Sequence, residues 1–181
     1  MYYNVFWFRR DLRLSDNVGL FHALKSALPV IPVFIFDKQI LDKLSDKSDP
    51  RVTFIFDTIV SLKKELQSKG SDLDVRYGDP FEIWTSVIGQ YNLKTVFANH
   101  DFESYGIFRD KSIEQLLKNN SIEFKTFKDH VIFEKNEIVK DDGKPYTVFT
   151  PYKRKWLEKL TSISDSVETS QFLESYNSEG L

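Results

Sequence analysis

The stretch VFWFRRDLRLSDNVGL, from Val5 to Leu20, decides the fold class of this 181-residue chain. Its first four residues form an apolar run, which is typical of a strand buried on both faces of a parallel sheet. Four charged residues then fall within positions 9–13, and Ser15, Asp16 and Asn17 offer helix N-cap side chains. A buried strand therefore ends in a charged loop that leads into a helix. In open α/β sheets, ligands bind at the carboxyl ends of such strands.

The same alternation of strand and helix continues along the chain. Apolar, β-branched or aromatic runs predict further strands at 30–36, 73–77, 95–98 and 122–127. Helical spacing, caps and breakers predict helices at 51–69, 81–91 and 103–119, and a short helical turn near 39–44. Connections of helix length require parallel strands with right-handed crossovers. We therefore expect an α/β fold with a doubly wound, Rossmann-like, five-stranded parallel sheet and helices on both faces.

Composition limits the classes of function. The hydrophobic fraction of 41% supplies a sizeable core, and the net charge of −2 gives the whole surface no strong attraction to nucleic acid. The absence of cysteine excludes disulfides, thiolate metal sites and a cysteine nucleophile, and the three histidines show no metal-ligand spacing, so no metal is expected. No signal peptide and no apolar segment near the ~18 residues of a membrane span is present. A cytoplasmic protein without a membrane partner is predicted.

Three stretches together resemble the DNA photolyase and cryptochrome family. WFRRDLRLSDN (7–17) resembles the opening of that family, and NHDFESYGIFRD (99–110) resembles its segment after the fourth strand. GKPYTVFTPYKRKW (143–156) resembles its closing signature. The resemblance covers residues 3–160, and it implies the N-terminal α/β domain of a two-domain protein.

The resemblance also implies a function and a domain layout. In many family members this α/β domain carries a light-harvesting (antenna) chromophore, which is a folate, a deazaflavin or FMN. A helical C-terminal domain holds FAD and damaged DNA, and has no counterpart before Leu181. We expect the photolyase-type core at 1–130, a closing segment at 131–160 and a polar linker toward the missing domain at 161–181. The parent would be a light-driven lyase that repairs pyrimidine dimers, whereas this chain alone would not be catalytic.

Carried over by position, the resemblance predicts a chromophore site at the strand ends. Asp101 and Glu103 are the leading polar contacts, and Phe36 would form an apolar wall. Arg51 would close the pocket or meet a chromophore phosphate. The full candidate set is Arg10, Phe36, Asp37, Arg51, Asn99, Asp101 and Glu103.

Several alternatives stay open at this point. The parent could be a cryptochrome photoreceptor, or the chain a free-standing nucleotide-binding domain, although the glycine-rich phosphate loop of such domains is missing. The charges at 9–13 fit a structural ion-pair network as well as a site, and 99–103 could be an ordinary helix cap. YKRKW (152–156) has the composition of a nucleic-acid patch, but its position favours packing between domains.

Overall fold

The computed structural model describes residues 1–46 and 48–164. Strands and helices alternate along the described chain, as the hydrophobic pattern predicts. The elements are β1 (Tyr3–Phe8), α1 (Val18–Leu24), β2 (Val30–Asp37), α2 (Lys38–Leu41), α3 (Pro50–Ser68), β3 (Asp74–Gly78), α4 (Pro80–Gln90), β4 (Leu93–Asn99), α5 (Ser104–Asn119), β5 (Glu123–Phe127), the 3₁₀ helix η1 (Lys135–Glu137) and α6 (Phe149–Ser164).

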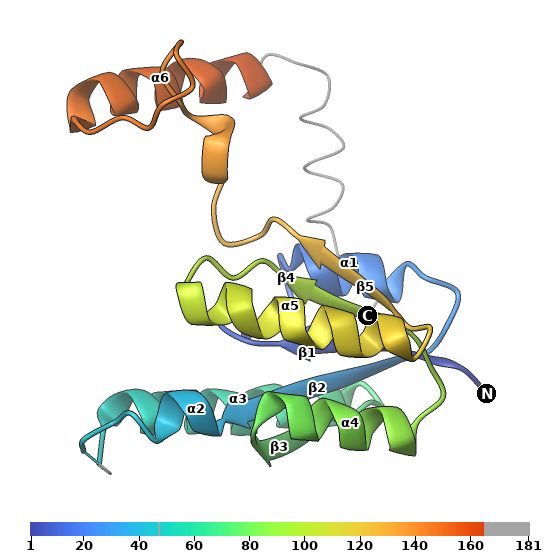
Figure 1. Ribbon diagram of the computed structural model, residues 1–181. Helices are drawn as coiled ribbons and strands as arrows, with labels where there is room; N and C mark the ends of the chain where they lie inside the picture. The colour runs from blue at the N-terminus through green and yellow to red at the C-terminus, as the bar shows by residue number, and fades with distance from the viewer. Residues whose placement is uncertain (47, 165–181) are drawn as a thin grey trace.

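The five strands form one sheet in the order β3-β2-β1-β4-β5, and every neighbouring pair is parallel (Figure 1). This confirms the predicted doubly wound α/β fold. From the central strand β1 the chain winds outward to β2 and β3, and then returns to add β4 and β5 on the other side of β1. The direction of winding therefore changes between β1 and β4, and in such sheets the ligand crevice lies at the carboxyl ends of the strands on either side of that point.

Each face of the sheet is buried by its own pair of helices. Val5 and Trp7 of β1 belong to a core shared with α4 and α5, whereas Phe6 and Phe8 belong to a second core shared with α1 and α3. The alternation follows from the two-residue period of a strand. Both faces being covered explains why β1 is apolar at every position from 5 to 8.

Polar side chains cap the helices that follow the strands. The side chain of Asn17 accepts from the backbone N–H of Leu20 at the start of α1, and Asp37 caps α2 in the same way. Asp49 and Asp79 cap α3 and α4, and each is followed by a proline at the first helical position.

The closing segment extends away from the sheet (Figure 1). Helix α6 is attached to the segment around η1, where Phe133 packs edge-on against Trp156 and Lys159 donates to the backbone carbonyl of Glu137. The helix includes the YKRKW stretch at 152–156, and residues 161–164, predicted as linker, form its last turn. The rest of the predicted linker lies outside the described residues. Between 1 and 164, leaving aside position 47, no helix is long and apolar enough to cross a bilayer.

Candidate functional site

A buried polar network occupies the point where the winding changes direction. Asn99 at the end of β4 is 1% exposed, and its amide nitrogen donates to Asp11 Oδ2 at 2.5 Å and to Asn17 Oδ1 at 2.9 Å. Its amide oxygen accepts from the backbone N–H of Gly19 at 2.9 Å. A Cβ atom at Gly19 would lie 2.6 Å from that oxygen, so the first turn of α1 can approach β4 this closely only with glycine. Asn99 thus holds α1 against the sheet.

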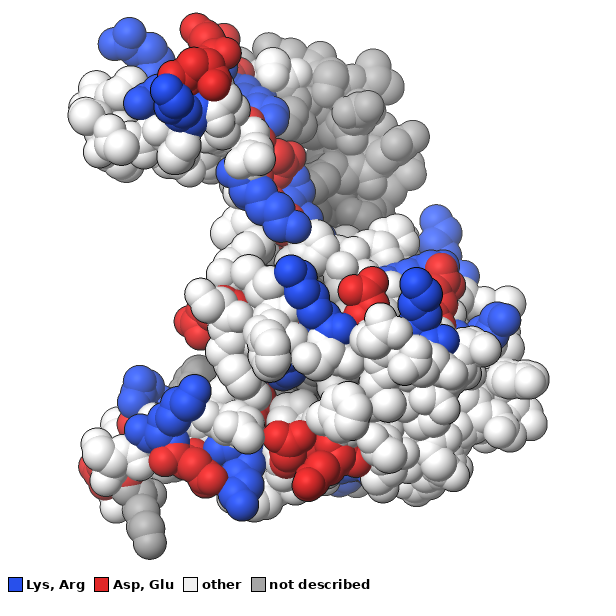
Figure 2. Space-filling view, viewed as in Figure 1, with Lys and Arg blue, Asp and Glu red and all other residues white. Residues whose placement is uncertain are grey.

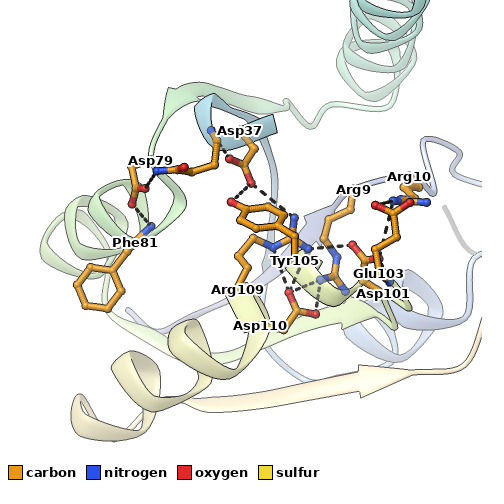
Figure 3. A network of polar contacts seen from close by, with 11 residues as sticks. Arg9, Arg10, Asp37, Asp79, Phe81, Asp101, Glu103, Tyr105, Arg109 and Asp110 are labelled. Carbon is orange, nitrogen blue, oxygen red and sulfur yellow. Dashed lines mark hydrogen bonds and ion pairs between the residues drawn. The ribbon is translucent and has the colours of Figure 1, made fainter. Parts of the chain in front are cut away.

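A second polar cluster lies across the carboxyl ends of the strands and has Arg109 of α5 at its centre (Figure 3). The guanidinium is 8% exposed and lies 3.2 Å from Asp101, 3.1 Å from Asp110 and 3.7 Å from Asp37. It also stacks over the Trp7 ring at 4.9 Å. Three carboxylates and an aromatic face therefore compensate the cost of burying this charge.

Arg9 adds a second buried cation to this cluster. Its Nη1 donates to both carboxylate oxygens of Asp110, and its guanidinium lies 5.0 Å from the centre of the Trp7 ring on β1. The charged loop after β1 is therefore braced by residues of its own domain. This supports the ion-pair interpretation of Arg9, while Arg13 pairs with Asp129 at 2.8 Å.

Tyr105 and Gln39 extend the cluster toward β3. The Tyr105 hydroxyl donates to Asp37 Oδ2 at 2.7 Å. Gln39 links two carboxylates, because its backbone N–H donates to Asp37 and its side-chain amide donates to Asp79. Burial and the hydrogen bond to Asp37 raise the pKa of Tyr105 above its ordinary value. The Tyr105 hydroxyl is therefore protonated at neutral pH, and it donates its one proton to Asp37. Lys43 lies 5.1 Å from the Tyr105 ring and adds a cation at its outer side.

Arg10, Asp101 and Glu103 form the opposite end of the cluster. Arg10 lies 2.7 Å from Glu103 and 4.0 Å from Asp101, and the side chains of Arg10 and Glu103 are 54% and 67% exposed. Burial acts to raise the pKa of Asp101, but the backbone N–H of Glu103 and the surrounding arginines outweigh it and hold that pKa below its ordinary value. Asp101 is therefore an anion under the cluster, whereas Glu103 faces solvent.

The structure brings together four of the seven predicted site residues. Arg10, Asp37, Asp101 and Glu103 lie in this strand-end cluster, with Arg109 joining Asp37 to Asp101. Asn99 lies instead in the buried network that holds α1. The two remaining predicted residues, Phe36 and Arg51, are placed elsewhere.

Phe36 packs edge-on against Phe34 at 4.9 Å, in the core beneath α3. Arg51 is exposed and forms an ion pair with Asp49 at the start of α3. Within the described residues, none of its hydrogen bonds or ion pairs reaches the other candidate residues. The roles proposed for these two residues in a chromophore site stay predictions.

The two residues that connect the cluster, Tyr105 and Arg109, are not among those predicted from the sequence. Their i,i+4 spacing places both on one face of a helix that starts a short loop after a strand. That spacing was a usable signal, because a tyrosine and an arginine on the helix face that follows Asp101 point back over the strand ends.

The histidines have structural partners. His22 stacks on Phe127 at 4.4 Å, and His100 Nδ1 lies 2.8 Å from Glu134, which ties the closing segment to the end of β4. Among the described residues, no group of three or more His, Cys, Asp or Glu side chains could hold a metal ion.

Comparison with known proteins gives the family. Residues 4–171 match the family model described as DNA photolyase, which is most of the chain. The chain belongs to the DNA photolyase family. It corresponds to the N-terminal α/β domain of photolyases, and the alternative of a free-standing nucleotide-binding domain is therefore dropped.

Individual relatives include photolyases and a cryptochrome. A deoxyribodipyrimidine photo-lyase of Halobacterium salinarum is 34% identical over 164 residues, covering 86% of this chain and 34% of that protein. An archaeal photolyase structure from Sulfolobus tokodaii, described as having two FAD molecules and implying a novel light-harvesting cofactor, has a TM-score of 0.72 and 31% identity over 84% of this chain and 34% of its own. Cryptochrome DASH of Arabidopsis thaliana is 28% identical and covers 90% of this chain and 30% of that protein. The photolyase domain described here thus spans about a third of the length of these relatives.

Proposed function

We propose that this domain holds a light-harvesting chromophore over the carboxyl ends of its strands. The observation that carries the proposal is the continuous row of polar contacts from Asp79 through Asp37 and Arg109 to Glu103 (Figure 3). The row crosses the ends of β3, β2, β1 and β4, and the outline of the molecule is indented beside it, between α2 and α5 (Figure 2). A ligand lying there would meet fixed polar groups from four strand ends.

The chemistry of the row suits an antenna. Energy transfer depends on the placement and orientation of the chromophore and needs no general acid or base. Arg9 and Arg109 and the buried carboxylates of the cluster are engaged with one another, so the accessible acceptor that the row offers a ligand is the exposed carboxylate of Glu103. Such a site favours the N–H groups of a folate, deazaflavin or flavin ring over a phosphate group. Glu103 is the leading contact because its carboxylate is accessible, and Asp101 supports it from below.

We further propose that the parent protein is a light-driven DNA repair enzyme. Its relatives include deoxyribodipyrimidine photo-lyases. The three stretches at 7–17, 99–110 and 143–156, which resemble the signatures of the family, support the same activity. FAD and damaged DNA would be held by a C-terminal helical domain, to which this domain would pass its excitation energy. The similarity to a cryptochrome DASH supports a photoreceptor as the second candidate. Repair of pyrimidine dimers by the full-length protein under blue light distinguishes the two.

A fluorescence titration of the purified chain with methenyl-folate, FMN and a deazaflavin tests the proposal. We expect saturable binding of one of them. Glu103→Ala removes a charged acceptor and is expected to weaken that binding about tenfold or more, since a hydrogen bond to a charged group contributes about 1.5–3 kcal/mol. Its unfolding transition should stay cooperative. Glu114→Ala, on an exposed position of the same helix, is the matched control and should bind as the unaltered chain does.

The outcomes separate the parts of the proposal. Absence of saturable binding to any of the three compounds would contradict the antenna role. Unchanged affinity in Glu103→Ala would remove Glu103 from the site.

A further inference from the structure

The closing segment leaves the sheet at the end of β5 and leads into α6 (Figure 1). Among residues 1–46 and 48–164, neither apolar core of the sheet includes a residue after Phe127. The joint between the sheet and the closing segment is crossed instead by ion pairs at Asp129, Glu134 and Glu137. The strength of such contacts depends on the charge of each partner, so a joint of this kind can respond to pH.

Glu134 is the carboxylate at this joint whose partner can change its charge. Its side chain is 8% exposed, and both of its oxygens lie 2.8 Å from Nδ1 of His100, which directly follows β4. Within the described part of the chain, His100 is the only cationic group within ion-pair distance of this carboxylate. Burying a carboxylate without an opposite charge is costly. The protonation of His100 therefore decides how well the charge of Glu134 is compensated.

His100 can contact Glu134 in both of its protonation states. A neutral ring donates from Nδ1 to Glu134 and accepts at Nε2 from the hydroxyl of Thr126, 3.1 Å away on β5. A protonated ring donates from both nitrogens, to Glu134 and to Thr126. The hydrogen bond to Glu134 then joins two opposite charges, which makes it about twice as strong as a neutral one. Protonation thus tightens the contact, within the range of about pH 5–8 where histidine ordinarily titrates.

The contact of Asp129 does not depend on a histidine. This carboxylate is 1% exposed and is paired with Arg13 at 2.8 Å, and it also accepts from the backbone N–H of Val18 at 2.9 Å. Arginine keeps its charge throughout the range in which proteins fold. His130 lies 3.9 Å from the same carboxylate, beyond hydrogen-bond distance. Asp129 is therefore compensated whether His130 is charged or neutral.

Glu137 connects Glu134 to α6. Its carboxylate accepts from the backbone N–H of Glu134 and pairs with Lys128 at 2.8 Å. Burial acts to raise the pKa of Glu137, but Lys128 and that backbone N–H outweigh it and hold the pKa below its ordinary value. The backbone carbonyl of Glu137 accepts from Lys159 of α6. A displacement of Glu134 is therefore passed on to the helix.

We propose that His100 and Glu134 form a pH-sensitive latch that holds the closing segment, and with it α6, in one direction relative to the sheet. With the ring protonated, the ion pair closes the latch. With the ring neutral, Glu134 keeps a hydrogen bond but loses its opposite charge, and α6 swings more freely about the residues that follow β5. The latch uses no member of the polar row proposed to hold a chromophore, so the two proposals stand or fall separately.

Backbone ¹⁵N relaxation of the chain at two pH values tests the latch. At about pH 5.5 we expect α6 to be as ordered as β4, with order parameters of about 0.85. At about pH 7.5 we expect the order parameters of α6 to fall below about 0.6, while those of β4 stay unchanged. The midpoint of the change should coincide with the titration of the His100 ring signals. Equal order of α6 at both pH values would overturn the proposal.

Three variants identify the group responsible. His100→Gln keeps an N–H donor toward Glu134 but cannot be charged, so its α6 should be mobile at both pH values. Glu134→Gln removes the carboxylate and should abolish the pH dependence as well. His130→Gln is the matched control, because His130 belongs to the same joint, and it should keep the pH dependence of the unaltered chain. The amide signals of the sheet show that each variant is folded. A pH dependence that persists in His100→Gln, or one that is lost in His130→Gln, would contradict the assignment to His100.

Discussion

Single side chains in this domain are held by partners far away in the sequence. Arg109 pairs with Asp37 across 72 positions and with Asp101 on the neighbouring loop, and Asn99 binds Asp11 across 88 positions. These contacts fix the strand ends relative to one another. Ion pairs and the hydrogen bonds of the Asn99 side-chain amide therefore support the candidate site from beneath. Its accessible members, Glu103 and Arg10, remain at the surface.

The lowered pKa of Asp101 predicts a loss of stability in acid. An unfolded chain protonates this carboxyl near pH 4, whereas the folded chain keeps it ionised to lower pH. The stabilisation is thus complete above about pH 5 and is lost as the pH falls through the folded pKa. Urea unfolding of the unaltered chain and of Asp101→Asn should show a difference at pH 7 that shrinks toward pH 3. A difference that is independent of pH would refute this assignment.

Asn99→Asp is expected to destabilise the fold by about 3 kcal/mol or more, because it replaces a donor by a carboxylate next to Asp11. The midpoint of denaturant unfolding measures the effect. The contacts of Asn99 also predict that this residue acts on folding rather than on ligand affinity. A stable Asn99→Asp chain with impaired chromophore binding would show that the sequence-based assignment of Asn99 to the site was right.

At the scale of elements, a glycine sets the approach of α5 to the loop that precedes it. A Cβ atom at Gly106 would lie 2.3 Å from the carboxyl carbon of Asp101, whose side chain is held by Arg109 and cannot yield freely. Helix α5 thus packs its first turn directly onto the buried anion.

Gly106→Ala should therefore cost about 1–3 kcal/mol of stability through overpacking. Gly89→Ala is the matched control, because this helical glycine of α4 has no atom within 4 Å of its added methyl group. It should stabilise the chain by about 0.4–1 kcal/mol. Thermal unfolding of both variants measures the contrast, and a neutral Gly106→Ala would mean that Asp101 can move aside.

The hydrophobic pattern predicted the elements and the doubly wound parallel sheet, but it did not predict the order of the strands. Each predicted strand and helix is present within a few residues, and Asn17 caps α1 as expected, because caps and periodicity are local properties. The position of β4 beside β1 depends on which side of the sheet a crossover returns to, and crossovers of helix length permit either side. Arg109 was missed for a similar reason: a charged helical residue is expected to face solvent unless its distant partners are known.

At the scale of the whole molecule, the surface charge is mixed in sign. Lysine, arginine and acidic side chains are interspersed over the face seen in Figure 2, in keeping with a net charge of −2. Helix α6 extends from the α/β body with Phe149 and Tyr152 exposed, as expected of a segment that packs against a further domain. The polar row at the strand ends is then the part of the domain where a chromophore would be held.

The most direct test of the antenna role is an amide chemical-shift titration of the ¹⁵N-labelled chain with the chromophore that binds in the fluorescence assay. We predict that the largest shifts fall at the strand ends, at Gln39, Glu103 and Tyr105. A groove of about 690 Å³ between α3 and the start of β3, lined by residues that include Val60 and Leu73, is the competing location. Shifts concentrated at Val60 and Leu73, with the strand ends unchanged, would contradict a chromophore site at the strand ends.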